Sequence, residues 1–533
     1  MRMYIALFTA LIAIIFSTLS TAILAYVAMA TPIGPWMEMT LVLIGTIIFK
    51  LCCTSLNARM QGLALATAAG GIGAAVAMAC AFSFPTLYFL DPITFNSWIS
   101  QPFYFAAILA GLVIAAGSFG MLIAYYFQGK LLSDPAMIFP IGQMVYNMIS
   151  VQNQLKKAIQ LAIGAAGAVG LGMLQAFTAL IPARLSLLPA FSLGIFHLPA
   201  VSTRTDMIPM FWAIGFTTGH VIALPLLVAV IAKLALVDPV HLLFFKNLRH
   251  TDYILAFGAG MAVQGAALSL FDIPKILHKS SARLLGNASS FLFFNQLNSS
   301  LLIPLLLLAF SGAFLTYFSF SWLAQIYLLA FTVLCTYQLL IIAGRLGIAP
   351  LGRFATFVMV PGLLLFGFSA AQTTLLATFV EITGVVAVDT LFGQKVAQLA
   401  QIKSSKMLLY QIVGLLVSAL AMGFIFWSLI THFGLGSPEL IASRAQSRAV
   451  LVQAFNFNYT VMILGFIFSY VLKFVGVNPT LVFGGLLMGM DTSLMLIAGG
   501  LSTYLVRDKE EHYPFWSGVY AANSLWIFIR MLF

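Results

Sequence analysis

Residues 3–31 contain no charged side chain, and uncharged apolar stretches of this kind recur as far as the C-terminus. Only 7% of the residues are charged and 62% are hydrophobic, whereas an average soluble domain has about 25% charged residues. The mean hydropathy is +1.05. Because a soluble monomer could not cover so much apolar surface, the sequence predicts an all-α, polytopic integral membrane protein.

The length of the apolar stretches indicates how many helices cross the bilayer. A transmembrane helix needs about 20 mostly apolar residues, which gives about 14–16 transmembrane helices here, some of them broken or re-entrant. The expected spans lie near residues 4–30, 36–53, 64–90, 102–128, 157–182, 207–236, 253–271, 299–318, 321–344, 354–372, 373–400, 406–432, 459–477, 480–505 and 513–533. No polar region is long enough for a soluble domain, so residues 1–533 are expected to form one membrane domain.

The formal net charge of +11 does not indicate nucleic-acid binding, because the basic residues stand singly in loops. Lys50, Arg59 and Lys130 fall in loops that alternate with a loop around Asp91, which has no Lys or Arg. Cytoplasmic loops of membrane proteins carry an excess of Lys and Arg. The sequence therefore predicts that the N-terminus lies in the cytoplasm.

Motifs of the common enzymes are absent from the sequence. The four cysteines form no metal-type spacing with histidine, and there is no HExxH, CxxC, P-loop or GxSxG motif. We therefore expect no metal site, no cofactor and no enzyme. A membrane-embedded enzyme acting on a lipid-linked substrate is an alternative. It would need a pair of acidic residues, and Asp91 with Asp134 is the only candidate pair. A passive channel is disfavoured because no pore motif is repeated.

Several hydrophobic segments are interrupted by proline beside glycine, a combination that breaks helices. Short or interrupted hydrophobic segments indicate the binding site of a transporter. Segment 134–150 is too polar and too short for an ordinary span, and we interpret it as a broken or re-entrant helix. An amphipathic interfacial helix is the alternative. The substrate pathway is expected to involve Phe139, Pro140, Gly142, Gln143, Tyr146 and Asn147, together with Gly70 and Gly71 of a glycine-rich span.

Ionisable residues inside membrane spans are costly and indicate function. Glu381 and Asp389 fall within one span, about 80° apart around the helix, so they share a broad face. Lys395 follows and could neutralise Asp389. Asp491 and His220 also lie inside apolar stretches. Because buried carboxyls and histidines can bind and release protons, these four residues, Glu381, Asp389, Asp491 and His220, are the proton-coupling candidates.

The ordered motifs resemble those of the oligopeptide transporter (OPT) superfamily, which includes the yellow-stripe-like metal-chelate carriers. Phe139-Pro140-Ile141-Gly142 resembles the family's Phe/Tyr-Pro-x-Gly segment. The other matching stretches are Phe8 to Phe49, Ala69-Gly70-Gly71 with Phe82 to Leu87, Pro209 to Gly219, Asp389-Thr390-Leu391 with Gly393 to Lys395, Gly499-Gly500 and Ser517-Gly518-Val519. The chain departs from the family pattern at Ile141, at Gln143-Met144 and at Asn523, so substrate specificity is not carried over. The chain looks closer to the bacterial branch of the family than to its eukaryotic peptide branch.

The resemblance implies a proton-coupled symporter that imports short peptides or peptide-like compounds across a bacterial inner membrane. The partners it implies are a small-molecule substrate, protons and membrane lipid, without nucleic acid, and a homodimer stays open. A rival interpretation keeps the fold and changes the substrate to a metal–chelate complex of the iron–siderophore kind. The 23 methionines, among them Met488 and Met490 beside Asp491, would suit soft-metal handling, although methionine is commonly a gap-filler in cores.

Overall fold

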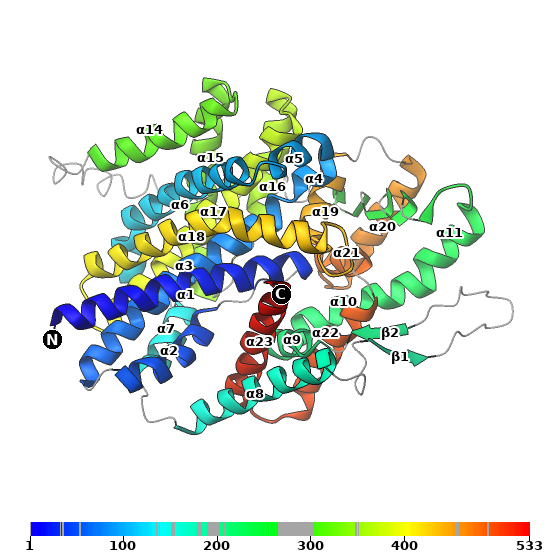
Figure 1. Cartoon of the computed structure of the whole chain (residues 1–533). Coiled ribbons are helices and arrows are strands. Elements are labelled where there is room, and N and C mark those ends of the chain that lie inside the picture. Colours follow the sequence, from blue (N-terminus) through cyan, green and yellow to red (C-terminus); the bar gives the residue numbers. More distant parts are fainter. Residues whose placement is uncertain are drawn as a thin grey trace. The chain divides into compact units, whose positions relative to one another are not determined.

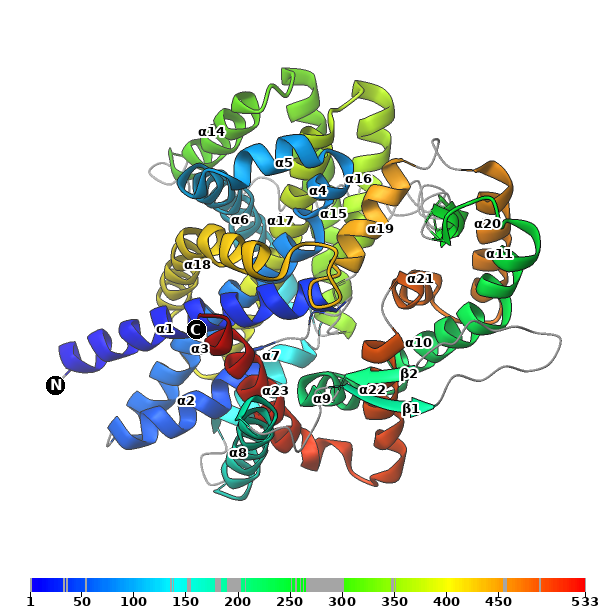
Figure 2. The same ribbon diagram turned by 45° about the vertical axis from the view of Figure 1, so that its right-hand side comes forward.

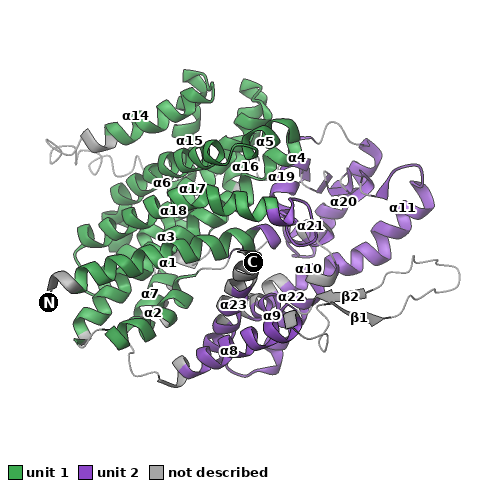
Figure 3. Ribbon diagram, in the orientation of Figure 1, with its two compact units in different colours: residues 1–28, 36–152, 266–431 green, residues 29–35, 153–265, 432–533 purple. Residues whose placement is uncertain are grey.

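The computed structural model describes most of the chain as helices (Figure 1). The described residues are 2–31, 34, 37–52, 55–134, 137, 139–150, 155–177, 184–188, 203–206, 208–250, 252–254, 256–258, 260–261, 263–264, 302–346, 349, 351–453, 458–487 and 490–532. These residues divide into two compact units, each assembled from separate stretches of the chain (Figure 3). Unit 1 comprises residues 1–28, 36–152 and 266–431, and unit 2 comprises residues 29–35, 153–265 and 432–533.

Unit 1 is built around two buried helices, α3 and α17. Its helices are α1 (Arg2–Ala30, whose last two residues fall in unit 2), α2 (Glu38–Cys52), α3 (Leu56–Ser83), α4 (Thr86–Leu90), α5 (Pro92–Ile99), α6 (Pro102–Ser133), α7 (Pro140–Ser150), α14 (Leu302–Tyr317), α15 (Trp322–Leu346), α16 (Leu351–Phe366), α17 (Ala370–Leu399) and α18 (Ser404–Phe433). The apolar windows of α3 and α17 are completely buried. Helix α17 packs against α3, α6, α7, α15 and α16 (Figure 2).

Unit 2 contains helices that are shorter and more often broken. They are α8 (Leu155–Phe177), α9 (Pro209–Thr218), α10 (His220–Ala232), the π-helix η1 (Lys233–Val237), α11 (Asp238–Phe244), α19 (Ser443–Val452), α20 (Tyr459–Phe474), α21 (Pro479–Leu487), α22 (Met490–Ser502), the 3-10 helix η4 (Thr503–Leu505) and α23 (Lys509–Leu532). The sequence did not predict the antiparallel pair β1 (Arg184–Leu188) and β2 (Thr203–Asp206), in which Arg184 lies opposite Asp206.

The all-α membrane fold expected from the sequence is confirmed. Among the described residues, seven helices are long and apolar enough to cross a membrane, and five shorter apolar helices accompany them. The described helices fall within most of the expected spans. The expected span 207–236 is divided at Gly219, whose φ of 63° ends α9 and begins α10. The expected span 480–505 is likewise divided, into α21 and α22.

Local sequence signals explain where the central helix α17 begins. Ser369 is its N-cap: the Ser369 hydroxyl accepts a hydrogen bond from the Gln372 amide at 3.2 Å. The Gln372 side chain in turn accepts one from the Ser369 amide at 3.1 Å, which completes a capping box. Gly367, with φ of 62°, makes the turn that precedes the cap. The cap satisfies backbone donors that would otherwise lack partners at the first turn.

Small residues set how closely α17 approaches its neighbours. A Cβ atom at Gly120 of α6 would lie 2.4 Å from the carbonyl oxygen of Thr383 on α17. At the same crossing, the Thr383 hydroxyl donates a hydrogen bond to the Ala116 carbonyl at 3.0 Å. Close approach through small residues, with hydrogen bonds between helices, is how helices associate in lipid, where the hydrophobic effect no longer drives their contact.

Asp91 lies outside the membrane-spanning helices and is the N-cap of α5. Its contribution to the stability of the folded protein depends on pH. Its carboxylate accepts hydrogen bonds from the Thr94 amide at 3.1 Å and the Thr94 hydroxyl at 2.6 Å. The Thr94 side-chain and backbone hydrogen bonds lower the pKa of Asp91 below its ordinary value. Because folding lowers this pKa, the stabilisation is present above the ordinary carboxyl pKa of about 3.9 and is lost as the pH falls through the lowered value.

We expect Asp91→Ala to reduce the free energy of unfolding by about 1 kcal/mol at neutral pH, with a smaller reduction in acid. Asp91→Asn retains an N-cap acceptor and is the matched control. Thermal unfolding of the purified protein in detergent over a pH series measures both variants. An Asp91→Ala penalty that stays constant across the pH series would contradict the role assigned to the carboxylate.

Candidate proton-coupling site

Helix α17 carries two buried carboxyl groups, those of Glu381 and Asp389. Their side chains are 1% and 2% exposed, and all residues from 373 to 394 of the helix are buried. They are eight positions apart in the sequence, which corresponds to about 12 Å along the helix axis. The two carboxyls are therefore separate sites on one helix, and each contacts a different set of neighbouring residues.

Glu381 is held by the end of α3. The hydroxyl of Ser83, the last residue of α3, donates a hydrogen bond to Glu381 Oε2 at 2.5 Å. Hydroxyl-to-carboxylate hydrogen bonds of about 2.5–2.7 Å are the charge-assisted kind. Ser83 is itself fully buried, so this contact lies inside the packed interface of α3 and α17.

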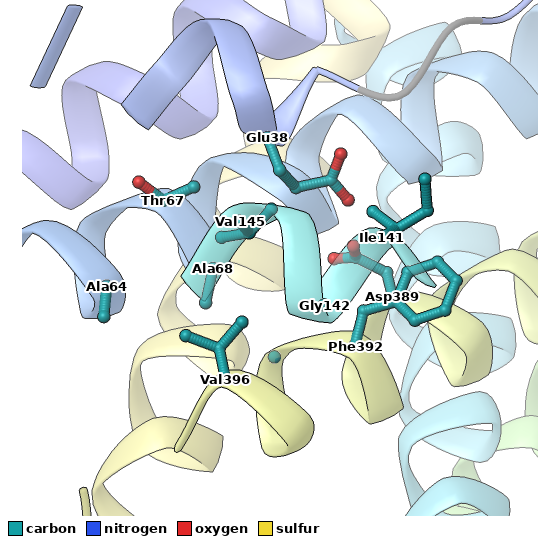
Figure 4. Close-up of a pocket in the computed structure, with 11 residues that line it drawn as sticks. Glu38, Ala64, Thr67, Ala68, Ile141, Gly142, Val145, Asp389, Phe392 and Val396 are labelled. Atoms are coloured by element: carbon teal, nitrogen blue, oxygen red, sulfur yellow. The ribbon is translucent and has the colours of Figure 1, made fainter. Parts of the chain in front are cut away.

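Asp389 faces a second carboxyl group, that of Glu38 at the first residue of α2. Figure 4 shows the two carboxyls pointing toward one another across the space between α2 and α17. Glu38 is 5% exposed, and its carboxyl acts electrostatically on that of Asp389. Both residues belong to unit 1. A carboxyl–carboxyl hydrogen bond requires that one partner carries a proton.

The third residue at this contact is Gly71 of α3. A Cβ atom at Gly71 would lie 3.0 Å from Asp389 Oδ2, 3.1 Å from Asp389 Oδ1 and 3.1 Å from Glu38 Cγ. Such distances are tighter than nearly all real Cβ contacts. The absence of a side chain at position 71 therefore leaves the space in which the two carboxyls meet.

The expectation that Lys395 neutralises Asp389 is wrong. The Lys395 ammonium hydrogen-bonds Gln398 Oε1 at 3.2 Å and lies 5.9 Å from the centre of the Phe139 ring. Lys395 points to a different side of α17 because it is six positions after Asp389, which corresponds to about 240° around the helix. In the described part of the chain, Asp389 thus has a carboxyl group where the sequence suggested a cation.

A small pocket beside the carboxyl pair connects it to the segment expected to line the substrate pathway. The pocket is lined from α2 by Glu38, from α3 by Ala64, Thr67 and Ala68, from α7 by Ile141, Gly142 and Val145, and from α17 by Asp389, Phe392, Gly393 and Val396 (Figure 4). Its lining is nearly all apolar, and it has room for about one water molecule. Glu38 and Asp389 are the only titratable residues among the described ones that line it.

The Phe139-Pro140-Ile141-Gly142 motif forms the start of the short helix α7. Phe139 adopts a φ of 52°, which is unusual for a residue other than glycine, and its amide donates to the Gly344 carbonyl at 2.7 Å. The turn at Phe139 points α7 onto α17, where a Cβ atom at Gly142 would lie 3.1 Å from the Phe392 carbonyl oxygen. The 11-residue helix packs against α2, α3, α15 and α17.

The remaining predicted pathway residues occupy varied positions. Gln143 is exposed and Tyr146 is half-buried, whereas the side chains of Pro140 and Asn147 lie outside the described part. At Gly70, a Cβ atom would lie 2.4 Å from Leu41 Cδ1, so this glycine serves the packing of α3 against α2.

The other two proton-coupling candidates belong to unit 2. His220 is the first residue of α10, directly after the break at Gly219, and its ring is exposed, 6.4 Å from that of Tyr504. Asp491 lies in α22, and its side chain is outside the described part.

Asn523, where the sequence departs from the family pattern, has a structural role. Its Oδ1 accepts a hydrogen bond from the Met210 amide at 3.2 Å, and the side chain is 4% exposed. Met210 is the second residue of α9, so its amide has no acceptor within the helix. Asn523 of α23 thereby accepts a hydrogen bond from an otherwise unpaired backbone amide in the first turn of α9, the helix that ends at Gly219.

Sequence reasoning missed Glu38, although the signal was present. Glu38 falls inside the apolar span expected at residues 36–53, and the criterion that selected Glu381 and Asp389 applies to it equally. Only the packing of α2 against α3 and α7 shows that the side chain is directed inward.

Comparison with known proteins places the chain. A family model described as OPT oligopeptide transporter protein matches residues 297–531, which include α17 with Glu381 and Asp389. No curated protein matches the chain. The structure adds two observations to this match: α17 carries buried carboxyls, and the described chain contains many apolar helices. Over residues 297–531 the chain is therefore similar to the OPT oligopeptide transporter family, and its apolar helices are those of an integral membrane protein.

Proposed function

We propose that this protein is a proton-coupled secondary importer of short peptides or peptide-like compounds. The observation that carries the proposal is the Asp389 carboxyl, which is 2% exposed within the buried stretch 373–394 of α17 and faces another acid instead of a base. A carboxyl group in such surroundings is expensive to keep charged, so it favours binding a proton. A residue of this kind can link proton movement to a change in helix packing.

The family match and the position of α7 support the substrate class and pathway. The family description names oligopeptides. Of the expected pathway residues, Gly142, Gln143 and Tyr146 belong to α7, and Phe139 directly precedes it. Because α7 lines the pocket beside Asp389, a change in protonation there acts directly on the pathway segment. We place the protein in a bacterial inner membrane with its N-terminus in the cytoplasm, as the loop charges predict.

Uptake by proteoliposomes tests the proposal. An inward proton gradient is imposed, and the liposomes receive a labelled pool of tri- to hexapeptides or, separately, iron bound to small chelators. We expect the peptides to accumulate and the accumulation to collapse with a protonophore. Accumulation of the iron chelate alone would move the protein to the metal-chelate interpretation, and peptide accumulation that survives the protonophore would overturn proton coupling.

Glu381 is the other buried carboxyl on α17, and replacing it by glutamine gives a further prediction. Glu381→Gln keeps an acceptor for the Ser83 hydroxyl but cannot exchange a proton. We expect this variant to be made and inserted normally while gradient-driven peptide uptake is abolished. Membrane expression and uptake are measured side by side, with Ser428→Ala as the control, because Ser428 lies on α18 with its hydroxyl outside this contact. Normal uptake by Glu381→Gln would remove Glu381 from the proton path.

A further inference from the structure

We infer that Glu38 and Asp389 together bind a single proton, which they hold in a carboxyl–carboxylate hydrogen bond between α2 and α17. The inference rests on the proposed function and makes it more specific: the proton site is a pair of side chains from two helices. It adds Glu38 to the residues that handle the proton.

The first support is the geometry of the contact. The two carboxyls point toward each other (Figure 4), and the side chains are 5% and 2% exposed. Glu38 Oε1, Glu38 Oε2 and Asp389 Oδ2 are buried and receive no hydrogen bond from any donor in the described part of the chain. Buried polar atoms in proteins nearly always have a partner. The atoms left over here are acceptors, and a proton on one carboxyl supplies the missing donor.

The second support is the charge around the pair. Apart from the two acids, every residue that lines the adjoining pocket from α2, α3, α7 and α17 is uncharged. The nearest cation along α17, Lys395, is directed toward Phe139. Two facing carboxylates with no cation between them would repel each other strongly in a medium of low dielectric. One shared proton replaces that repulsion with a hydrogen bond.

The third support is the space that α3 provides. Gly71 presents its bare Cα to both acids, and a methyl group there would lie within 3.1 Å of each. The site is therefore formed by three helices. Helices α2 and α17 provide the carboxyl oxygens, and α3 provides a glycine whose missing side chain leaves space for them.

The shared proton also gives a physical link to movement within unit 1. When the proton leaves, the two carboxylates repel, which favours states in which α2 and α17 separate at this level. Helix α7 contacts both α2 and α17, so the segment that begins at Phe139 is released by the same event. Protonation restores the contact and the packing of α7.

Infrared spectroscopy of the purified full-length protein in lipid tests whether the proton is shared. A protonated carboxyl has a carbonyl stretch that is distinct from that of a carboxylate and that shifts in heavy water. We expect one buried carboxyl band in the wild-type protein that Glu38→Gln shifts and Asp389→Asn removes or shifts. The double variant should lose no more than this one band. Asp91→Asn is the matched control, because Asp91 lies outside the pair.

The outcomes separate this inference from the proposed function, because the spectrum needs no substrate. A band that Asp389→Asn removes and Glu38→Gln leaves unchanged assigns the proton to Asp389 alone and overturns the shared site. Two bands that disappear independently in the two variants also overturn it. If the shared band is present but the peptide pool is not taken up with protons, the proton pair stands and the proposed function fails.

Discussion

Asp389→Asn should abolish the proton-driven accumulation of peptide while leaving the protein folded in the membrane. The amide has nearly the same size as the carboxyl, and it donates a hydrogen bond to Glu38 where the proton now lies. The contact between α2 and α17 therefore survives, but it no longer depends on a proton. A transporter whose helix contact cannot respond to protons cannot draw energy from their gradient.

Proteoliposomes measure the effect as the ratio of internal to external peptide under an inward proton gradient. For Asp389→Asn this ratio should fall to the value obtained without a gradient, whereas Asp91→Asn should behave like the wild type. Size-exclusion profiles and thermal unfolding in detergent report whether each variant is folded. Accumulation at the wild-type level in a folded Asp389→Asn protein would show that Asp389 does not couple transport to protons.

Gly71→Ala should have the second-largest effect, although the substitution adds only one methyl group. That group would lie 3.0 Å and 3.1 Å from the two Asp389 oxygens and 3.1 Å from Glu38 Cγ, so the acids must move apart. Overpacking of this kind costs about 1–3 kcal/mol of stability. Because the inferred hydrogen bond between the acids would be lost, Gly71→Ala should also remove most of the gradient-driven uptake.

Gly129→Ala is the matched control for this change, because nothing lies within 4 Å of a Cβ atom at Gly129, on α6 of the same unit. Uptake under a proton gradient and the unfolding temperature are compared for both variants. If Gly71→Ala loses stability but keeps full proton-driven uptake, Gly71 serves packing alone. Equal behaviour of the two alanine variants would contradict the close contact at Gly71.

The apolar spans and the importance of α17 could be predicted from the sequence because both depend on local composition. Long uncharged stretches have no stable alternative to helices in lipid, and the expected span 373–400 corresponds closely to α17. The acids Glu381 and Asp389 stood out because charges within such spans are rare. The break at Gly219 was harder to place, since a glycine in an apolar run indicates close packing as readily as a positive φ.

The partners of these acids could not be predicted, because they come from distant parts of the chain. Ser83 and Glu381 are 298 positions apart, and Glu38 and Asp389 are separated still more widely. Periodicity shows that Glu381 and Asp389 share a face of one helix, but it does not show what that face meets. Lys395 illustrates the difficulty: its closeness in sequence suggested an ion pair, whereas the structure directs it toward Phe139.

The measurement that tests proton coupling most directly is the flow of protons driven by peptide. Liposomes that contain the transporter and an internal pH-sensitive dye are given an inward gradient of the tri- to hexapeptide pool, with no initial pH difference and with potassium and valinomycin to cancel the membrane potential. We predict that the lumen acidifies as peptide enters wild-type liposomes, and that liposomes with the Asp389→Asn variant do not acidify. Entry of labelled peptide into wild-type liposomes without any change in internal pH would contradict proton coupling.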